Sequence, residues 1–174
     1  HHNWLNRIRR VRRREILRIG TRDICLGIPL PIIMEEISEV AEAILQVVLE
    51  GSLRKLSSSK NGKGSAGFAI LAMGKLGGRE LNYSSDIDLI AIKSSKEGGL
   101  RHIKEGKNLH KNFSKLMENI LHDLSSHTEE GYVYRVDLRL RPFGAAGLLV
   151  QDSSKIVEYY QRKASIWELQ AALK

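Results

Sequence analysis

The feature that most constrains the fold is a short apolar segment opened by two acids, Asp86-Ile87-Asp88-Leu89-Ile90-Ala91-Ile92. Its length and its branched apolar residues predict a buried β-strand. Because side chains alternate between the two faces of a strand, Asp86 and Asp88 leave the same face. Carboxylates placed side by side repel each other unless a cation lies between them. The segment therefore predicts a sheet with a cation site at one end, the alternative being a strand end whose acids are merely solvated.

A third carboxylate is predicted on the same face. Residues 132–141 alternate between polar and apolar, which predicts a strand stopped by Pro142, with Asp137, Arg139 and Arg141 on one face. Three acids can hold hard divalent ions such as Mg²⁺, and arginines beside them suit bidentate contact with phosphate. The alternative is a purely structural role, in which the arginines only neutralise the aspartates as ion pairs.

A glycine-rich turn precedes this strand pair. The segment Gly74-Lys75-Leu76-Gly77-Gly78 is not a Walker A loop, because Ala69 stands at the position of the required glycine and Leu76 at that of the hydroxyl. A glycine after a strand nevertheless lets phosphates approach the backbone, and a following helix N-terminus favours anions. Lys75 either reaches a phosphate or covers the turn.

Hydrophobic periodicity predicts the remaining elements. We expect helices over 4–20, 31–56, 79–83, 100–125 and 153–173, and further strands over 67–73 and 148–150. Gly20 is expected to end the first helix, and residues 57–65, which include no apolar side chain, are expected to form a linker. The expected organisation is a helical segment 1–56, a linker 57–65 and an α+β domain 66–174 with a mixed sheet.

Positive charge is concentrated at the N-terminus. The net charge is +8, and the first thirty residues hold eight arginines against two acids. Apolar residues among these arginines recur at roughly helical spacing, at Trp4, Ile8, Val11, Leu17 and Ile19. We therefore expect a helix with one buried face and a solvated basic face, and consider a nucleic-acid-binding arm less probable.

Cysteine content and hydropathy bear on location. A single cysteine, Cys25, cannot form an internal disulfide, which favours a reducing compartment. No apolar run reaches the roughly 18–20 residues that span a bilayer, and the first residues lack the apolar core of a signal peptide. We expect a cytoplasmic protein that does not bind membranes.

The order of strand, glycine turn, Asp-x-Asp and later Asp resembles the nucleotidyltransferase superfamily typified by DNA polymerase β. More narrowly, residues 73–90 (MGKLGGRELNYSSDIDLI) and 135–144 (RVDLRLRPFG) resemble the bacterial glutamine synthetase adenylyltransferase/adenylyl-removing family. Shorter stretches at 12–23, 147–150 and 159–168 resemble it too, so that the resemblance spans nearly everything outside 57–65 and 93–130.

The resemblance implies a metal-dependent enzyme with a mixed sheet and flanking helices. It implies that Mg²⁺, with Mn²⁺ as a substitute, is held by the catalytic residues Asp86, Asp88 and Asp137. Contacts with the phosphates of ATP, ADP or inorganic phosphate are implied for Gly74, Lys75, Ser85, Arg139 and Arg141.

In that family, two such domains lie in one long protein that regulates nitrogen assimilation. One transfers AMP from ATP to a tyrosine of glutamine synthetase, and the other removes it with phosphate and releases ADP. The sequences at 82–88 and 135–137 resemble those of the N-terminal, adenylyl-removing half. The chain is expected to be a fragment that is truncated at its C-terminal end relative to the family. Glutamine synthetase is the implied partner, and the PII signal protein could act through the full-length enzyme. The alternatives are nucleotidyl transfer to RNA or a small molecule, or a non-catalytic regulatory or nucleic-acid-binding module.

Overall fold

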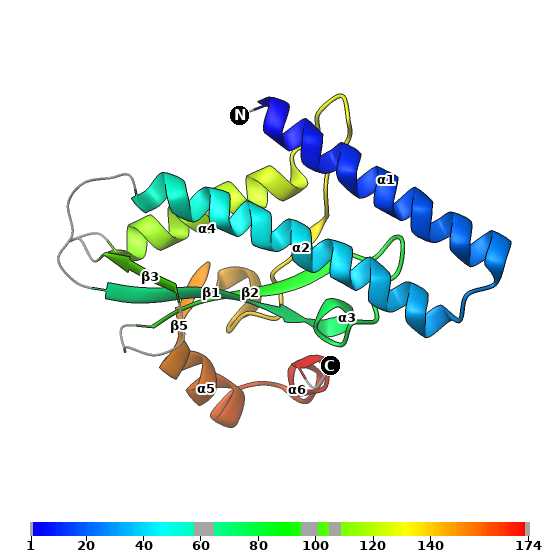
Figure 1. The fold of residues 1–174 in the computed structure, drawn as a ribbon. Coiled ribbons are helices and arrows are strands. Elements are labelled where there is room, and N and C mark those ends of the chain that lie inside the picture. Colours follow the sequence, from blue (N-terminus) through cyan, green and yellow to red (C-terminus); the bar gives the residue numbers. More distant parts are fainter. Residues whose placement is uncertain (1, 58–64, 95–100, 105–108, 173–174) are drawn as a thin grey trace.

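The structure is a computed structural model of the 174-residue chain and describes residues 2–57, 65–94, 101–104 and 109–172. Its elements are, in order, α1 (His2–Leu26), α2 (Leu30–Ser57), β1 (Ser65–Met73), α3 (Gly74–Gly77), β2 (Ile87–Ser94), β3 (Arg101–Lys104), α4 (Leu109–Ser125), β4 (Val136–Asp137), the 3₁₀ turn η1 (Gly144–Ala146), β5 (Val150–Asp152), α5 (Ser153–Arg162) and α6 (Ile166–Ala172). Figure 1 shows the sheet with α2 and α4 on one side, α1 outside α2, and α5 and α6 on the other side. This is the predicted α+β class, and it is consistent with a nucleotidyltransferase-like fold.

The sheet is mixed, as predicted. Its order is β3-β1-β2-β4, and β5 also pairs with β2. β1 runs antiparallel to both β2 and β3, whereas β4 and β5 run parallel to β2. The start of β2 therefore lies between the end of β1 and β4, and its later residues lie beside β5.

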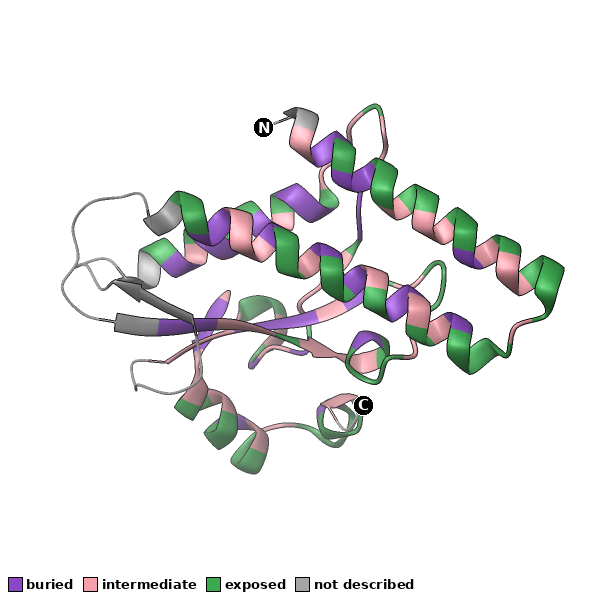
Figure 2. Ribbon diagram, in the orientation of Figure 1, coloured by how far each residue is buried: buried purple, intermediate pink, exposed green. Residues whose placement is uncertain are grey.

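The hydrophobic core lies between the sheet and the layer formed by α2 and α4. From Ile33 to Val48, the buried apolar residues of α2 recur every three or four positions, at Ile33, Ile37, Ala41, Ile44 and Val48. The buried apolar residues of α4 are Phe113, Leu116, Met117, Ile120 and Leu124. The ring of Phe113 stacks on that of Phe68 in β1, with centroids 5.3 Å apart. Figure 2 shows buried residues recurring along both helices. The bounds of α2 and α4 confirm the helices predicted over 31–56 and over the later part of 100–125.

The N-terminal helix is longer than predicted. The prediction that Gly20 ends it is wrong, because α1 continues through Gly20 to Leu26. Gly20 faces Tyr83, whose ring lies 3.9 Å from the position that a Cβ would occupy there. Of the predicted buried face, Ile8 and Ile19 are buried and Trp4 packs partly against the core, while Val11 and Leu17 are exposed.

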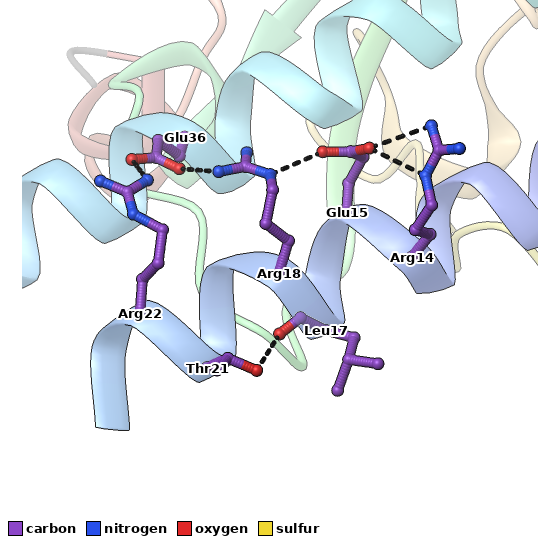
Figure 3. Close-up of polar contacts among 7 residues, drawn as sticks. All are labelled: Arg14, Glu15, Leu17, Arg18, Thr21, Arg22 and Glu36. Carbon is purple, nitrogen blue, oxygen red and sulfur yellow. Dashed lines mark hydrogen bonds and ion pairs between the residues drawn. The ribbon is translucent and has the colours of Figure 1, made fainter. Parts of the chain in front are cut away.

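Most of the charged side chains in the C-terminal half of α1 form ion pairs. Arg14 and Arg18 contact Glu15, and Arg18 and Arg22 contact Glu36 of α2, as Figure 3 shows. Such exposed pairs contribute at most about 1 kcal/mol each, but together they neutralise much of the local charge and connect the two helices. The expectation that this segment does not bind nucleic acid stays a prediction.

One arginine of α1 is buried. Arg9 is 1% exposed, and its guanidinium donates from Nε to the carbonyl of Gly131 (2.6 Å) and from Nη2 to that of Ser126 (2.5 Å). Burial lowers the pKa of Arg9, and the charge of Asp123 opposes that effect. The side chain therefore anchors α1 to the segment that follows α4.

Replacing Arg9 by methionine should lower the free energy of unfolding by about 2–3 kcal/mol, because hydrogen bonds from a charged donor are lost inside the protein. Arg14→Met, which removes an exposed arginine from the same helix, should change stability by less than about 1 kcal/mol. Urea denaturation of both variants measures the difference. Equal losses in the two variants would contradict the anchoring role of Arg9.

Two predictions of helical structure near the sheet are wrong. Residues 101–104, expected to begin a helix, form β3 on the edge of β1. Residues 79–83, also expected to be helical, form an irregular segment that the amide of Leu81 ties to Ser38 of α2. In both cases, pairing with a distant segment overrides the local pattern. The linker prediction falls mostly on residues 58–64, outside the described residues, as do residues 105–108 of the expected long helix.

The C-terminal part also departs from expectation. Only Val136–Asp137 of the strand predicted over 132–141 joins the sheet, and the strand expected at 148–150 forms as Val150–Asp152. The last helix is broken between α5 and α6, because Ser165 begins a new helix, its amide and hydroxyl both donating to the carboxylate of Glu168. None of the helices in the described ranges combines the length and apolar character needed to cross a membrane.

Candidate active site

The site forms where β2 begins. Asp88 lies opposite Met73 of β1 on one side and opposite Asp137 of β4 on the other. Because directly paired residues present their side chains on the same face, the carboxylates of Asp88 and Asp137 are neighbours. The amide of Ile87 donates to the carbonyl of Arg135 (3.0 Å), which fixes this register. The predicted shared face of Asp88 and Asp137 is thus confirmed.

These carboxylates border an open cleft of about 360 Å³. The cleft is lined by Lys75, Asn82, Ser84, Ser85, Asp86, Asp88, Arg135, Asp137 and Arg139. Six of the eight residues expected at the site therefore lie around one polar cleft.

The two central acids have opposite electrostatic environments. Asp137 accepts hydrogen bonds from the amide (2.8 Å) and the Nε (2.7 Å) of Arg139, and the latter contact is the main reason that its pKa is lowered. The pKa of Asp88 is raised by burial and by the charges of Asp137 and Asp86. Asp88 thus carries negative charge that the neighbouring cations compensate incompletely.

The glycine turn backs directly onto Asp88. Gly74 has a positive φ of 55°, and a Cβ there would lie 2.5 Å from Oδ2 of Asp88. Lys75, in the short helix α3, places Nζ 3.5 Å from the hydroxyl of Ser85, which itself donates to Asn82 (2.6 Å). The turn therefore brings its backbone and one ammonium group to the edge of the cleft.

Arg141, expected at the site, is directed elsewhere. Its guanidinium donates to the carbonyls of Leu138 (2.9 Å), Ala145 (3.1 Å) and, at 3.4 Å, Gly147. It holds the turn after β4 and is not among the residues lining the cleft. The alternation behind the prediction ends at Asp137, where β4 ends, so Arg141 no longer shares the strand's face.

Sequence reasoning overlooked Arg135. Its Nε donates to Asp86 (2.5 Å), and its Nη2 donates to the carbonyl of Ser84 (3.0 Å). The hydrogen bond to Asp86 raises the pKa of Arg135. The available signal was its position two residues before Asp137, within the same alternating pattern.

The donor set suits a metal that also binds phosphate. Among the residues that the structure describes, no group of three or more His, Cys, Asp or Glu side chains is placed to hold a metal ion. Mg²⁺, however, is usually bound through one or two carboxylates together with substrate phosphates and water. The adjacent Asp88 and Asp137, with the uncompensated charge on Asp88, fit that requirement, and Asp86 lines the same cleft.

Comparison with known proteins identifies the family of the chain. Residues 2–174 match the family model described as glutamate-ammonia ligase adenylyltransferase. A bifunctional glutamine synthetase adenylyltransferase/adenylyl-removing enzyme of Methylococcus capsulatus is 38% identical over 178 residues, covering 99% of this chain and 19% of the relative. The enzyme of the same description from Nitrosococcus oceani is also 38% identical, covering 96% of this chain and 18% of the relative. The chain thus spans about a fifth of the length of these relatives. Together with the acids and the glycine turn of the cleft, the match over nearly the whole chain shows that the chain belongs to the glutamate-ammonia ligase adenylyltransferase family.

Proposed function

We propose that this chain is a metal-dependent nucleotidyltransferase domain that acts on the adenylyl group of glutamine synthetase, removing AMP by phosphorolysis. The observation that carries the proposal is the pairing of Asp88 with Asp137 at a cleft that also holds Arg139 and Lys75. The two carboxylates can bind a divalent cation and the two basic side chains can bind phosphate oxygens. Together they suit the transfer of a phosphoryl-containing group to a phosphate. The names of the relatives support glutamine synthetase as the target, and PII would act through a longer protein.

In the proposed reaction, an oxygen of inorganic phosphate attacks the phosphorus of the adenylyl group. The bond from phosphorus to the tyrosyl oxygen breaks, ADP leaves, and the tyrosine oxygen takes up a proton. Asp86, Asp88 and Asp137 would hold Mg²⁺ or Mn²⁺, whose chemistry is to neutralise phosphoryl oxygens. Arg139 would orient the incoming phosphate, and Gly74, Lys75 and Ser85 would hold the phosphates of the nucleotide.

Transfer of AMP from ATP to glutamine synthetase uses the same residues, because attacking and leaving oxygens are stabilised alike. Nucleotidyl transfer to RNA or a small molecule is a more distant alternative. For a non-catalytic nucleic-acid-binding module, the surface would be the arginines of α1. Their engagement with Glu15, Glu36 and Glu130 makes that surface less available.

The direction of reaction is tested with both forms of the substrate. The chain is incubated with adenylylated glutamine synthetase plus phosphate, and separately with unmodified glutamine synthetase plus ATP. We expect release of ADP in the first reaction to exceed incorporation of AMP in the second at matched concentrations. Greater incorporation would move the domain to the transferring activity, and the absence of both would contradict the proposal.

Arg139→Ala should raise the KM for phosphate by at least about tenfold while changing nucleotide binding less, because a charged hydrogen-bond donor to phosphate is lost. Arg54→Ala, which removes the same charge from α2 away from the cleft, is the matched control. Steady-state kinetics at varied phosphate concentration measures the effect. An unchanged KM for phosphate would assign Arg139 only to its ion pair with Asp137.

A further inference from the structure

We infer that the helical pair α1–α2 positions the catalytic carboxylates by anchoring residues 78–86, here called the site loop, and that Tyr83 and Asp23 are positioning residues. The site loop joins α3 to β2 and ends on Asp86. The effect on catalysis rests on the proposed function, whereas the anchoring itself does not.

The site loop has little regular structure of its own. None of its residues belongs to a helix or a strand, and its amides at Gly78, Arg79 and Glu80 bond back to the carbonyls of α3. Arg79 adopts a left-handed φ of 56°, which is costly for a residue other than glycine. A segment of this kind needs support from elsewhere to hold a fixed conformation.

That support comes from four polar contacts with the helical pair, one of which is the ion pair of Arg79 Nε with Glu35 of α2 at 3.8 Å. Arg79 Nη2 lies 3.1 Å from Glu39 of α2, and the amide of Leu81 donates to the buried hydroxyl of Ser38 (3.1 Å). The hydroxyl of Tyr83 donates to Oδ2 of Asp23 on α1 (2.9 Å). The contacts of Arg79 and Leu81 are with α2 and that of Tyr83 is with α1, so both helices hold the loop.

The Tyr83 contact is the one nearest the acids. Tyr83 is followed by Ser84, whose carbonyl accepts a hydrogen bond from Arg135, and Arg135 also binds Asp86. A shift of the backbone at Tyr83 therefore moves the carbonyl of Ser84, which orients Arg135. Arg135 in turn orients the carboxylate of Asp86. Positioning errors well below 1 Å are enough to weaken a site that must present several groups together.

The contact can be removed without damaging the core. Asp23 and Tyr83 border an open cavity of about 660 Å³ on the surface of α1, and Tyr83 is 37% exposed. Burial and the hydrogen bond to Asp23 raise the pKa of Tyr83, so its hydroxyl remains a donor at neutral pH. Tyr83→Phe keeps the ring beside Gly20 and removes only the hydrogen bond.

The test is hydrogen–deuterium exchange of the ligand-free chain, comparing wild type with Tyr83→Phe, Asp23→Ala and the double variant. We expect amides of residues 82–87 to exchange about three- to tenfold faster in each single variant, as for the loss of one hydrogen bond. The double variant should show no further increase, because both substitutions remove the same contact. Glu15→Gln, which weakens ion pairs of α1 that do not touch the loop, should leave these amides unchanged.

A second measurement connects the loop to the site. In calorimetric titration with ADP and Mg²⁺, and separately with ATP and Mg²⁺, Tyr83→Phe should raise the Kd about threefold or more. The melting temperature should change little, and Glu15→Gln should bind as wild type does. Unchanged exchange in Tyr83→Phe, additive exchange in the double variant, or faster exchange with unaltered affinity would each overturn the inference. A wild-type chain that binds neither ADP nor ATP would instead contradict the proposed function, and exchange alone would then decide the anchoring.

Discussion

Replacing Asp86 and Asp88 together by asparagine should abolish divalent-ion-dependent nucleotide binding while the chain remains folded. Asparagine keeps the shape of both side chains but removes the charge that a cation requires. Calorimetric titration with ATP and either Mg²⁺ or Mn²⁺ measures the loss, which we expect to exceed about a hundredfold, since metal and phosphate binding depend on each other.

The matched control is Asp152→Asn. Asp152 caps α5 by accepting from the amide of Ser154, and asparagine caps helices about as well. This variant should bind nucleotide as wild type does. Metal-dependent binding retained in the Asp86/Asp88 double variant would show that these residues are not the ligands.

The thermal stability of the chain provides an independent test of the electrostatics at Asp88. The pKa of Asp88 is raised in the folded chain by burial and by its acidic neighbours. Its ionised form therefore opposes folding at neutral pH, and this cost disappears as the pH falls below the ordinary range of a carboxyl group. We expect the single variant Asp88→Asn to melt at a higher temperature than wild type at pH 7.

The second large effect is expected from Gly74→Ala. At φ 55° an alanine is strained by about 1–2 kcal/mol, and its Cβ would lie 2.5 Å from Oδ2 of Asp88. The carboxylate must turn away from the cleft to relieve this overlap. We therefore expect both a loss of stability of that size and a loss of Mg²⁺-dependent ATP affinity of at least about tenfold.

Gly27→Ala separates the two causes. Gly27 has nearly the same φ, 56°, but a Cβ there meets no atom within 4 Å. It should lose similar stability in urea denaturation and bind ATP normally. Similar affinities for the two variants would mean that Gly74 serves the backbone conformation alone.

Sequence alternation predicted the shared face of two of the acids. The register of β2 with β4 brings Asp88 and Asp137 together, whereas Asp86 precedes the first residue of β2. Arg139 and Arg141 both follow Asp137, the last residue of β4, so the strand period fixes neither of them. Arg139 still reaches the cleft because it donates to Asp137, whereas Arg141 donates to carbonyls of the turn that follows. A local pattern does not reveal where a strand loses its partner.

Other errors have the same origin. The helical spacing seen across 100–125 hid β3, whose strand conformation depends on pairing with Gly67 and Phe68 more than thirty residues earlier. The prediction that Gly20 ends a helix is wrong as well, because α1 continues to Leu26 and packs along α2. By contrast, the break before α6 was visible in the sequence, since Ser165 and Glu168 have the spacing of a capping box.

The buried position of Arg9 also constrains the order in which the chain can fold. Its acceptors Ser126 and Gly131 lie 117 and 122 residues further along. At synthesis rates of about 5–20 residues per second, α1 would wait roughly ten seconds for them to be made. Until then, α2 is the only part of the fold against which the apolar residues of α1 can pack. The guanidinium of Arg9 stays hydrated during that time. We therefore expect a late docking step for α1, in which the last-formed contacts of the N-terminal helix are those with the turn after α4.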